Sequence, residues 1–255
     1  MKNEPKQMEK NQPERSNEQL HDPDFVKNLF DSMCETYGIV NYFSSLGFTE
    51  RWRRQCLNHV DVNSGDVVLD FMTGMGEMFP HLQKNASQKL NVCAVDISSA
   101  MCQQAKETGD RFGNNDVQFQ VTQMNALQPG IKPSSADAIV ASFGLKTFSE
   151  RQIHRLAETV RSLLKPGGQY AMIEISVPSN PVIRVPYLFY IHYLIPLIGR
   201  VCLGDPADYR LLGTYTESFG SCEWCKPIFH EHGLTAEVTP YFFGCMTALH
   251  GRRPS

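Results

Sequence analysis

Apolar and polar positions along the chain indicate helices first and then an alternation of strands and helices. The apolar residues between Phe25 and Met33 recur at helical spacing, and a second helix is predicted over residues 50–60. Beyond residue 66, short apolar runs alternate with amphipathic segments, which is the pattern of βα units. The amphipathic segments predict helices over residues 77–84, 98–112 (with Ser98 as its N-cap) and 149–164.

Short runs rich in β-branched and aliphatic residues predict the strands of one sheet. Most of the first five predicted strands are separated by predicted helices. Strands that are connected through helices run parallel, with the helices on both faces of the sheet. The last two follow each other closely and are predicted to be antiparallel at one edge. The fold class is therefore α/β, with a mostly parallel seven-stranded sheet. The runs are "DVVLDF", "LNVCAVD", "VQFQVT", "ADAIVAS" and "QYAMIEIS", followed by two strands within "GLTAEVTPYFFGCMTALHG".

The first 24 residues differ from the rest of the chain. They are polar, mixed in charge and almost free of aliphatic side chains, so they cannot bury enough surface to offset the entropy of ordering. A disordered tail is therefore predicted over residues 1–24, and a single domain over residues 25–255. The tail has neither the apolar core of a secretory signal nor the acid-poor composition of a mitochondrial presequence.

Residues 180–205 form the most apolar stretch of the chain, within a predicted insertion over residues 180–220. Its length approaches that of a transmembrane helix, but two arginines, a histidine and internal prolines interrupt it, and these are costly in a bilayer core. We therefore expect a broken helical lid that covers the active site and rests on a membrane surface. Periodicity alone fits a lid packed wholly on its own domain equally well.

Composition places the chain among ordinary soluble globular proteins, with 42% hydrophobic and 20% charged residues. A net charge of −3, with no basic segment, argues against a nucleic-acid partner. The eight cysteines are scattered rather than spaced as a disulfide framework, which is typical of a reducing compartment.

The stretch "VVLDFMTGMGEMF" carries the main candidate binding site. A strand ends at Asp70, a turn with Gly74 and Gly76 follows, and a helix begins after it, so backbone N–H groups and a helix dipole face a ligand. Asp96 ends the next strand, where an acidic side chain can accept hydrogen bonds from both ribose hydroxyls. Dinucleotide binding is the first alternative, but the turn lacks the third glycine of that fingerprint.

Further motifs over residues 26–252 resemble those of the UbiE-type quinone methyltransferases. "YGIVNYFSSLGFTERW" is similar to their first signature, with Gly38 and Thr49 in place of Asp and His, and "LLKPGGQYAMIEIS" matches their second. "SFGLKTF" and "GDPADYRLL" parallel two more family segments. The resemblance implies a class I S-adenosylmethionine-dependent methyltransferase (Rossmann-like) fold and a polyprenylated quinone substrate at a membrane surface. The residues it implies for binding S-adenosylmethionine are Asp70, Thr73, Gly74, Gly76, Asp96, Ile97, Gln123, Met124 and Ser142.

The chain departs from the family where chemistry is expected. Lys146 and Thr147 stand where the family has Arg and Asn, which are thought to help deprotonate the ring, and Thr73 adds a branched side chain at the methionine end of the cofactor. With "DFMTGMGE", these departures resemble the rhodoquinone biosynthesis branch of the family. That resemblance implies that an amino group taken from S-adenosylmethionine replaces a methoxy group of ubiquinone, with a manganese ion assisting. The catalytic residues then expected are Thr73, Lys146, Tyr37 and Tyr209.

Two other functions fit the same sequence. One is ordinary S-adenosylmethionine-dependent C-methylation of a polyprenylated quinol. The other is a non-catalytic quinone-binding scaffold, although a scaffold does not need a ribose-binding carboxylate. The resemblance also implies a peripheral protein on the cytoplasmic face of the inner membrane, or on the matrix side of the mitochondrial inner membrane in a eukaryote.

The sequence does not define the metal ligands. "CEWCKPIFHEH" holds two cysteines and two histidines, but on one helix and its end, so ordinary packing is favoured over a zinc site. Hard oxygen ligands suit manganese, and the candidates are Glu77, Asp205 and Asp208. Tyr215 and His192 are further candidates for the quinone pocket.

Overall fold

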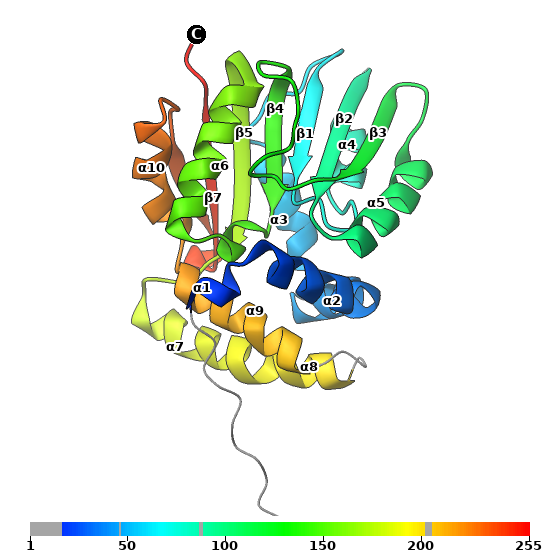
Figure 1. The fold of residues 1–255 in the computed structure, drawn as a ribbon. Coiled ribbons are helices and arrows are strands. Elements are labelled where there is room, and N and C mark those ends of the chain that lie inside the picture. Colours follow the sequence, from blue (N-terminus) through cyan, green and yellow to red (C-terminus); the bar gives the residue numbers. More distant parts are fainter. Residues whose placement is uncertain (1–16, 46, 87–88, 202–205) are drawn as a thin grey trace, which may run out of the picture.

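The computed structural model describes residues 17–45, 47–86, 89–201 and 206–255 and forms one sheet with helices on both faces (Figure 1). The seven strands have the order β3-β2-β1-β4-β5-β7-β6. Strands β1 to β5 are parallel, while β7 pairs antiparallel with both β5 and β6. The predicted α/β fold with an antiparallel edge is confirmed. The strands are β1 (Val67–Phe71), β2 (Leu90–Asp96), β3 (Val117–Gln123), β4 (Ala136–Ser142), β5 (Leu164–Ile175), β6 (Glu237–Tyr241) and β7 (Met246–Arg252).

The parallel register brings the carboxyl ends of β1, β2 and β4 to one edge of the sheet. Asp70 in β1 pairs with Ala94 in β2 and with Val140 in β4. Asp96 and Ser142 are the last residues of β2 and β4. The loops that follow these strands therefore open at the same end, which is where open α/β sheets bind their ligands.

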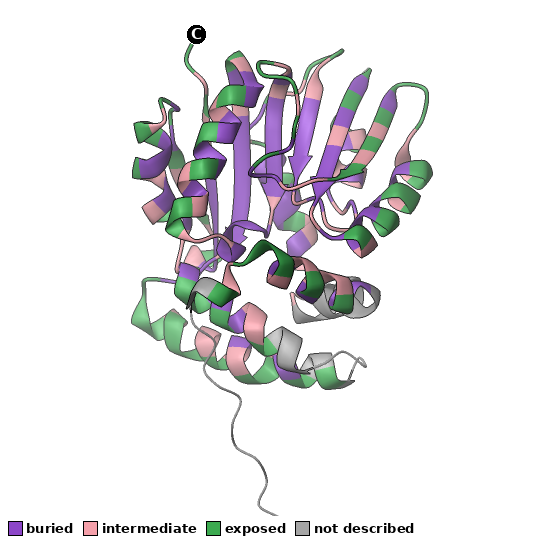
Figure 2. Cartoon of the chain, in the orientation of Figure 1, coloured by how far each residue is buried: buried purple, intermediate pink, exposed green. Residues whose placement is uncertain are grey.

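Helices cover both faces because side chains along each strand alternate between two apolar surfaces. On one face Leu156 and Phe229 pack with Tyr170 of β5, and on the other Cys56 and Leu82 pack with strand residues of β1 and β2. The central strands are therefore buried along their length (Figure 2). The first face carries α6 (Glu150–Leu163) and α10 (Cys225–Glu231), and the second carries α3 (Phe48–Leu57), α4 (Phe79–Asn85) and α5 (Ser99–Phe112).

The predicted helices are present, with ends shifted by a few residues. Ser98 caps α5 by accepting a backbone hydrogen bond at 3.1 Å, as predicted. Ser149 caps α6 and forms a capping box with Gln152. Helix α4 begins at Phe79 rather than at residue 77, because the glycine turn continues through Met78.

A layer of helices lies below the carboxyl ends of the strands (Figure 1). This layer includes residues 17–24, which are predicted from the sequence to belong to the disordered tail. The carbonyl of Leu20 accepts a hydrogen bond from the Tyr215 hydroxyl, and that of His21 accepts one from the Gln152 amide at 2.9 Å. Leu20 also packs against the apolar cluster that contains Tyr215, so the folded part begins earlier than composition indicates. The helices of the layer are α1 (Asn17–Leu20), α2 (Pro23–Ser44), α7 (Pro181–Phe189), α8 (Ile195–Val201) and α9 (Pro206–Phe219).

The predicted insertion over residues 180–220 is a run of helices with an irregular centre. Between α7 and α8 the chain widens into a π-helical segment, Tyr190–Leu194. Pro196 follows directly and lacks an N–H group, so the regular hydrogen-bond ladder is interrupted there. Helix α8 packs on α9 and α2. Among the described residues, no helix is both long and apolar enough to span a bilayer.

Candidate cofactor and substrate site

A cavity opens at the carboxyl ends of β1, β2 and β4, between their loops and the start of α2. Its empty space is about 820 Å³, a volume that includes open solvent at its mouth. Most of the wall is apolar, and a few polar groups converge on it, as expected for a small-molecule site. Of the residues that the sequence predicts for cofactor binding, Gly74, Asp96, Ile97, Met124 and Ser142 line this cavity.

The loop between β1 and α4 favours glycine at two positions. Gly74 and Gly76 have positive φ angles of 58° and 79°. A Cβ atom on Gly74 would lie 2.8 Å from the Glu77 carboxylate, and one on Gly76 would lie 2.7 Å from the Phe79 ring. Both distances are shorter than real Cβ contacts and both φ angles are positive, so glycine is favoured at both positions, most strictly at Gly76, where the neighbour is a buried ring.

Asp96 holds the glycine loop from the second strand. Its Oδ2 accepts a hydrogen bond from the Gly74 N–H at 2.8 Å, and its Oδ1 accepts one from the Ser98 N–H at 2.9 Å. Burial raises the pKa of Asp96 to about 6, although both hydrogen bonds act in the opposite direction. The side chain still lines the cavity, so ribose hydroxyls of a bound nucleoside can donate to it.

Asp70 lies fully buried under the loop, and Thr73 is its hydrogen-bond partner. The Thr73 hydroxyl donates to Oδ2 of Asp70 at 2.5 Å, whereas Oδ1 of Asp70 has no hydrogen-bond partner. Burial raises the pKa of Asp70 to about 7, and the Thr73 hydrogen bond only partly opposes this. From the sequence, the Thr73 side chain is expected to crowd the methionine end of the cofactor. In the structure its hydroxyl points to Asp70 instead, and its catalytic role stays a prediction.

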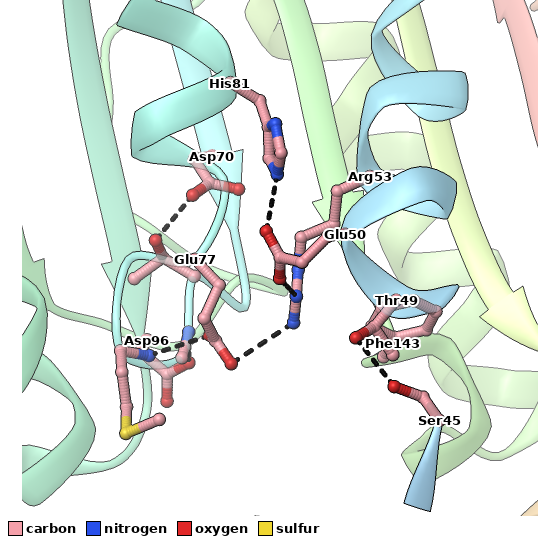
Figure 3. Close-up of polar contacts among 12 residues, drawn as sticks. Ser45, Thr49, Glu50, Arg53, Asp70, Glu77, His81, Asp96 and Phe143 are labelled. Carbon is pink, nitrogen blue, oxygen red and sulfur yellow. Dashed lines mark hydrogen bonds and ion pairs between the residues drawn. The ribbon is translucent and has the colours of Figure 1, made fainter. Parts of the chain in front are cut away.

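A chain of charged side chains connects α3 and α4 with the glycine loop (Figure 3). Arg53 donates through Nη1 to Glu50 at 2.5 Å and through Nη2 to Glu77 at 3.2 Å. Glu50 also lies 2.9 Å from Nε2 of His81, and that hydrogen bond lowers the pKa of Glu50. The buried guanidinium of Arg53 lies 5.3 Å from the centre of the Phe143 ring. Because Arg53 and Glu77 both line the cavity, this chain places a compensated ion pair beside the loop.

Lys146 does not line the cavity. Its Nζ donates to Oε1 of Glu174 at 2.8 Å and to the Phe143 carbonyl at 2.7 Å, and both members of this ion pair are buried. The backbone N–H of Lys146 donates to the same carboxylate at 3.0 Å. Gly144 and Thr147, on either side in the sequence, line the cavity instead. The catalytic assignment of Lys146 stays a prediction.

The remaining predicted site residues lie in several places. The Gln123 amide donates to the Ile97 carbonyl at 3.0 Å and is exposed beside the cavity. Gly76 shapes the turn but lines a neighbouring surface pocket. Tyr37 and Tyr209 belong to α2 and α9, but their side chains fall outside the described part of the structure.

Many cavity residues were not predicted from the sequence. Those with polar or aromatic side chains that reach the cavity from different elements include His21, Arg53, Asn125, Phe143 and Gln152. Three of these had a local signal, because Asn125 directly follows the predicted Met124, Phe143 directly follows the predicted Ser142, and Arg53 directly follows the first family signature. His21 and Gln152 reach the cavity through tertiary folding.

The described residues contain no group of three or more His, Cys, Asp and Glu side chains that could hold a metal ion. Glu77 is engaged in its ion pair, and Asp205 and the side chain of Asp208 are not among the described positions. Cys222 and Cys225 are buried in the core. The structure therefore defines no ligand set for manganese, and that expectation stays a prediction.

The residues present fit S-adenosylmethionine. Asp96 offers acceptors for ribose hydroxyls, and Ile97 and Met124 offer apolar surface for a base. At the other end, Arg53 lines the cavity with its guanidinium paired to Glu50 and Glu77 and its Nε without a partner, whereas Asp70 lies beneath the loop and outside the cavity wall. The fold and this set of groups define an S-adenosylmethionine site of the class I methyltransferase type.

Solved structures of other proteins share this fold. An S-adenosylmethionine-dependent methyltransferase from Aquifex aeolicus is 19% identical, with 91% of this chain and 98% of that chain covered and a TM-score of 0.54. The [4+2]-cyclase SpnF is 13% identical, with 91% and 97% covered and a TM-score of 0.60. These identities show the fold alone, and a cyclase among the neighbours shows that the fold does not determine the reaction.

The model of the ubiE/COQ5 methyltransferase family matches residues 15–252, and this chain belongs to that family. The ubiquinone/menaquinone biosynthesis C-methyltransferase UbiE of Hydrogenovibrio crunogenus is 28% identical over 213 residues, which cover 82% of this chain and 81% of the relative. The demethylmenaquinone methyltransferase of Lactiplantibacillus plantarum is 27% identical over 239 residues, which cover 93% and 98%. The protein is therefore an S-adenosylmethionine-using transferase whose relatives act in quinone biosynthesis.

Proposed function

We propose that this protein replaces a methoxy group of polyprenylated ubiquinone by an amino group, with S-adenosylmethionine as the amino donor. The observation that carries the proposal is the altered loop after β1. Thr73 occupies a position where such loops often have glycine, and its hydroxyl is bonded to Asp70, whose other oxygen stays without a partner. Membership in the family supports the cofactor and a quinone substrate, and the proposal adds the identity of the transferred group.

Bound S-adenosylmethionine would supply both an α-amine and a sulfonium methyl group. A methoxyquinone is a vinylogous ester, so an unprotonated amine can add to the ring carbon that bears the methoxy group. A C–N bond would form to the ring, the C–O bond would break, and the methoxy group would leave as methanol with a proton from the nitrogen. Release of the aminoquinone would then require the bond between that nitrogen and the cofactor's Cα to break, with a Cβ proton moving to the nitrogen and a Cα–Cβ double bond left in the remainder. The site therefore has to accept a proton from an ammonium group near neutral pH.

The proposed proton acceptor is Asp70, which lies directly beneath the loop rather than in the cavity wall, so the loop has to give the ammonium access to it. Its pKa is raised to about 7, and its Oδ1 atom has a free lone pair in a buried position. A general base is most effective when its pKa lies near the working pH. Thr73 donates to Oδ2, which leaves Oδ1 as the oxygen available for the proton.

Lys146 also favours amino transfer over C-methylation. By resemblance, the family uses this position to help remove a proton from a ring C–H before methyl transfer. Here the ammonium is neutralised by Glu174 and does not line the cavity. Substitution at a methoxy-bearing carbon removes no ring C–H proton, so it does not need a cation at this position.

C-methylation of a polyprenylated quinol is the second candidate function. It is favoured by the comparisons, since the relatives are named C-methyltransferases and demethylmenaquinone methyltransferases. In that reaction the sulfonium methyl must lie in line with the ring carbon, and a misplacement near 1 Å costs roughly a hundredfold in rate. The loop residues around Thr73 would then adjust that alignment.

The substrate and the surroundings complete the proposal. A polyprenylated quinone resides in a bilayer, so we place the protein at a membrane surface, on the cytoplasmic face of the inner membrane or on the matrix side in a mitochondrion. Manganese is retained from the resemblance. Loss of turnover on chelation and recovery with manganese alone would support it, whereas full activity after chelation would remove it from the proposal.

Isotope transfer tests the reaction directly. The purified protein is incubated with ubiquinone in detergent micelles and S-adenosylmethionine labelled either at the amine nitrogen or at the methyl carbon. Mass spectrometry of the quinone should find the nitrogen label on the ring and a loss of methoxy. A methyl label on the ring without nitrogen would contradict amino transfer and establish the second candidate. If titration calorimetry detects no S-adenosylmethionine binding, the protein is a scaffold.

A further inference from the structure

Exposed large hydrophobic side chains are confined to two segments of the described chain. Outside these segments, the large apolar residues that the structure describes are buried or half-buried. Soluble proteins rarely leave large apolar side chains clustered in water, so such clusters mark contact surfaces. The first segment is the α7–α8 face, made of Val182, Val185, Phe189, Tyr193, Leu194 and Leu197, and the second is the diphenylalanine turn, Phe242 and Phe243.

The diphenylalanine turn has a strained backbone. Phe242 and Phe243 have positive φ angles of 45° and 59°, in a short helical turn that ends at Gly244. The left-handed region is unfavourable for bulky residues, and such conformations persist where the surrounding structure enforces them. Here the strained turn leaves the Phe243 ring 76% exposed. A turn that only connects β6 and β7 could use glycine or asparagine without this cost.

The same turn is firmly mounted on the domain. The ring of Phe242 lies 4.7 Å from that of Phe48 and 6.2 Å from that of Trp52. Trp52 in turn packs edge-on against Phe143, which lines the cavity. Phe243 is therefore the outer end of an aromatic column that begins at the cavity wall. Its projection from the surface is fixed by packing.

The two apolar segments border one another. The hydroxyl of Tyr187 in α7 donates to the carbonyl of Cys245, directly after the diphenylalanine turn, at 3.3 Å. Helix α7 belongs to the layer below the carboxyl ends of the strands (Figure 1), which is also the end at which the cavity opens. The exposed side chains thus form one apolar border on the cavity end of the molecule.

The charge around this border fits an anionic lipid surface. From Ile175 to Val201 the chain contains Arg184, Arg200 and His192 but no aspartate or glutamate. Glu217 of α9 pairs with His192 at 2.9 Å, so the two arginines carry the positive charge of this segment. Between Val238 and Leu249 there is no charged residue at all. Aromatic and aliphatic side chains flanked by arginines are the composition of segments that lie in the lipid headgroup region.

We propose that the diphenylalanine turn inserts into a lipid surface as a second anchor beside the α7–α8 face, so that the cavity end faces the membrane. Two separated contacts define an orientation, which a single amphipathic helix does not. The inference extends the membrane-surface part of the proposed function and is independent of which group the enzyme transfers.

Vesicle co-sedimentation without quinone or S-adenosylmethionine tests this proposal, so its failure is separate from failure of the proposed reaction. The vesicles are phosphatidylcholine, alone or mixed with phosphatidylglycerol. Phe243→Asn should lower the partition coefficient about tenfold, because an exposed phenyl group no longer enters the apolar phase. Asparagine tolerates positive φ, so the turn and the melting temperature should be kept. Phe243→Leu is the matched control and should retain most of the binding.

Two further variants complete the test. Leu194→Asp with Leu197→Asp should weaken binding through the α7–α8 face, and combining them with Phe243→Asn should abolish it. Wild-type binding should be stronger on the anionic vesicles and should decrease with added salt. Unchanged binding of Phe243→Asn would overturn the second anchor. A wild type that binds neither vesicle, but forms a dimer that Phe243→Asn dissociates, would assign the surface to a second copy of the chain.

Discussion

Two regions of the molecule differ in the exposure of their side chains. One is the loop after β1, and the other is the border formed by the α7–α8 face and the diphenylalanine turn. At the loop, Asp70 and Asp96 are buried carboxylates held by short hydrogen bonds, Asp70 from Thr73 three residues away and Asp96 from Gly74 across to the neighbouring strand. At the border, Phe243 and its neighbours are apolar groups that point into water. The loop is complete without a partner surface, whereas the border is not.

This difference separates what the family shares from what distinguishes its members. Cofactor binding depends on local geometry at strand ends, which the whole class of folds provides. The reaction depends on which acceptor is brought to the cavity and on how the charges at its wall are compensated. A cyclase and a methyltransferase with the same fold illustrate this separation.

Asp96→Ala is the strongest test of the loop half of the comparison. The loss of two hydrogen bonds from ribose to a charged acceptor, each worth about 1.5–3 kcal/mol, should weaken S-adenosylmethionine binding at least about a hundredfold. Titration calorimetry measures the dissociation constant, with the exposed Asp116→Ala as the control. Asp96→Asn, which keeps one acceptor, should be intermediate. An unchanged constant in Asp96→Ala would refute the assignment.

Lys146→Met tests how much the buried ion pair between Lys146 and Glu174 contributes to stability. It leaves the fully buried Glu174 without its cation, which should lower the free energy of unfolding by about 3–5 kcal/mol. Chemical denaturation measures this loss. Adding Glu174→Gln removes the uncompensated charge and should recover much of the stability. If Lys146→Met alone is as stable as the wild type, the ion pair contributes little.

The pH dependence of stability probes Asp70. Its folded pKa of about 7 lies above the ordinary carboxyl value, so the folded state binds the proton more tightly, and stability falls as pH rises from about 4 through about 7. Asp70→Asn cannot titrate. Between pH 5 and pH 8, the wild type should therefore lose roughly 2–3 kcal/mol relative to this variant. Asp116→Asn should leave the pH profile of the wild type unchanged, and a profile shared by wild type and Asp70→Asn would contradict the raised pKa.

Thr73→Gly and Lys146→Arg address the reaction itself, with the smallest expected effects. Thr73→Gly removes the hydroxyl that bonds Asp70 and adds backbone freedom to the loop. Lys146→Arg must fit a planar guanidinium into a buried site that holds a compact ammonium. Each should lower aminoquinone formation about tenfold or more, equivalent to about 1.4 kcal/mol of transition-state stabilisation.

The affinity for S-adenosylmethionine is the internal control for both variants, and it should change much less, because Asp96 remains in place. Thr73→Ser retains the hydroxyl and should keep most of the activity. Full activity in Thr73→Gly would show that the altered loop does not direct the transferred group.

The cofactor half of the site followed from the sequence because its geometry is local. A strand end and a turn with two positive-φ glycines are adjacent in the sequence, an acidic residue ends the next strand, and the parallel register aligns the two strand ends. The insertion was also recognisable as a broken apolar segment, because prolines and arginines interrupt it, and the structure has a π-helical break there. The predicted tail boundary was less accurate, because the bonds that attach Leu20 and His21 come from α9 and α6.

The sequence by itself thus determined the α/β fold, the glycine loop and the two carboxylates at the strand ends. Only the tertiary structure decided which charged groups pair with one another and which apolar side chains are exposed to water. Lys146 pairs with Glu174, which lies 28 residues away in the sequence, and Arg53 pairs with Glu77, which lies 24 residues away. Phe243, which the sequence places in an edge hairpin, proved to be an exposed end of an aromatic column. Spacing along a chain defines which residues share an element, but compensation of charge and exposure to water depend on elements that meet only after folding.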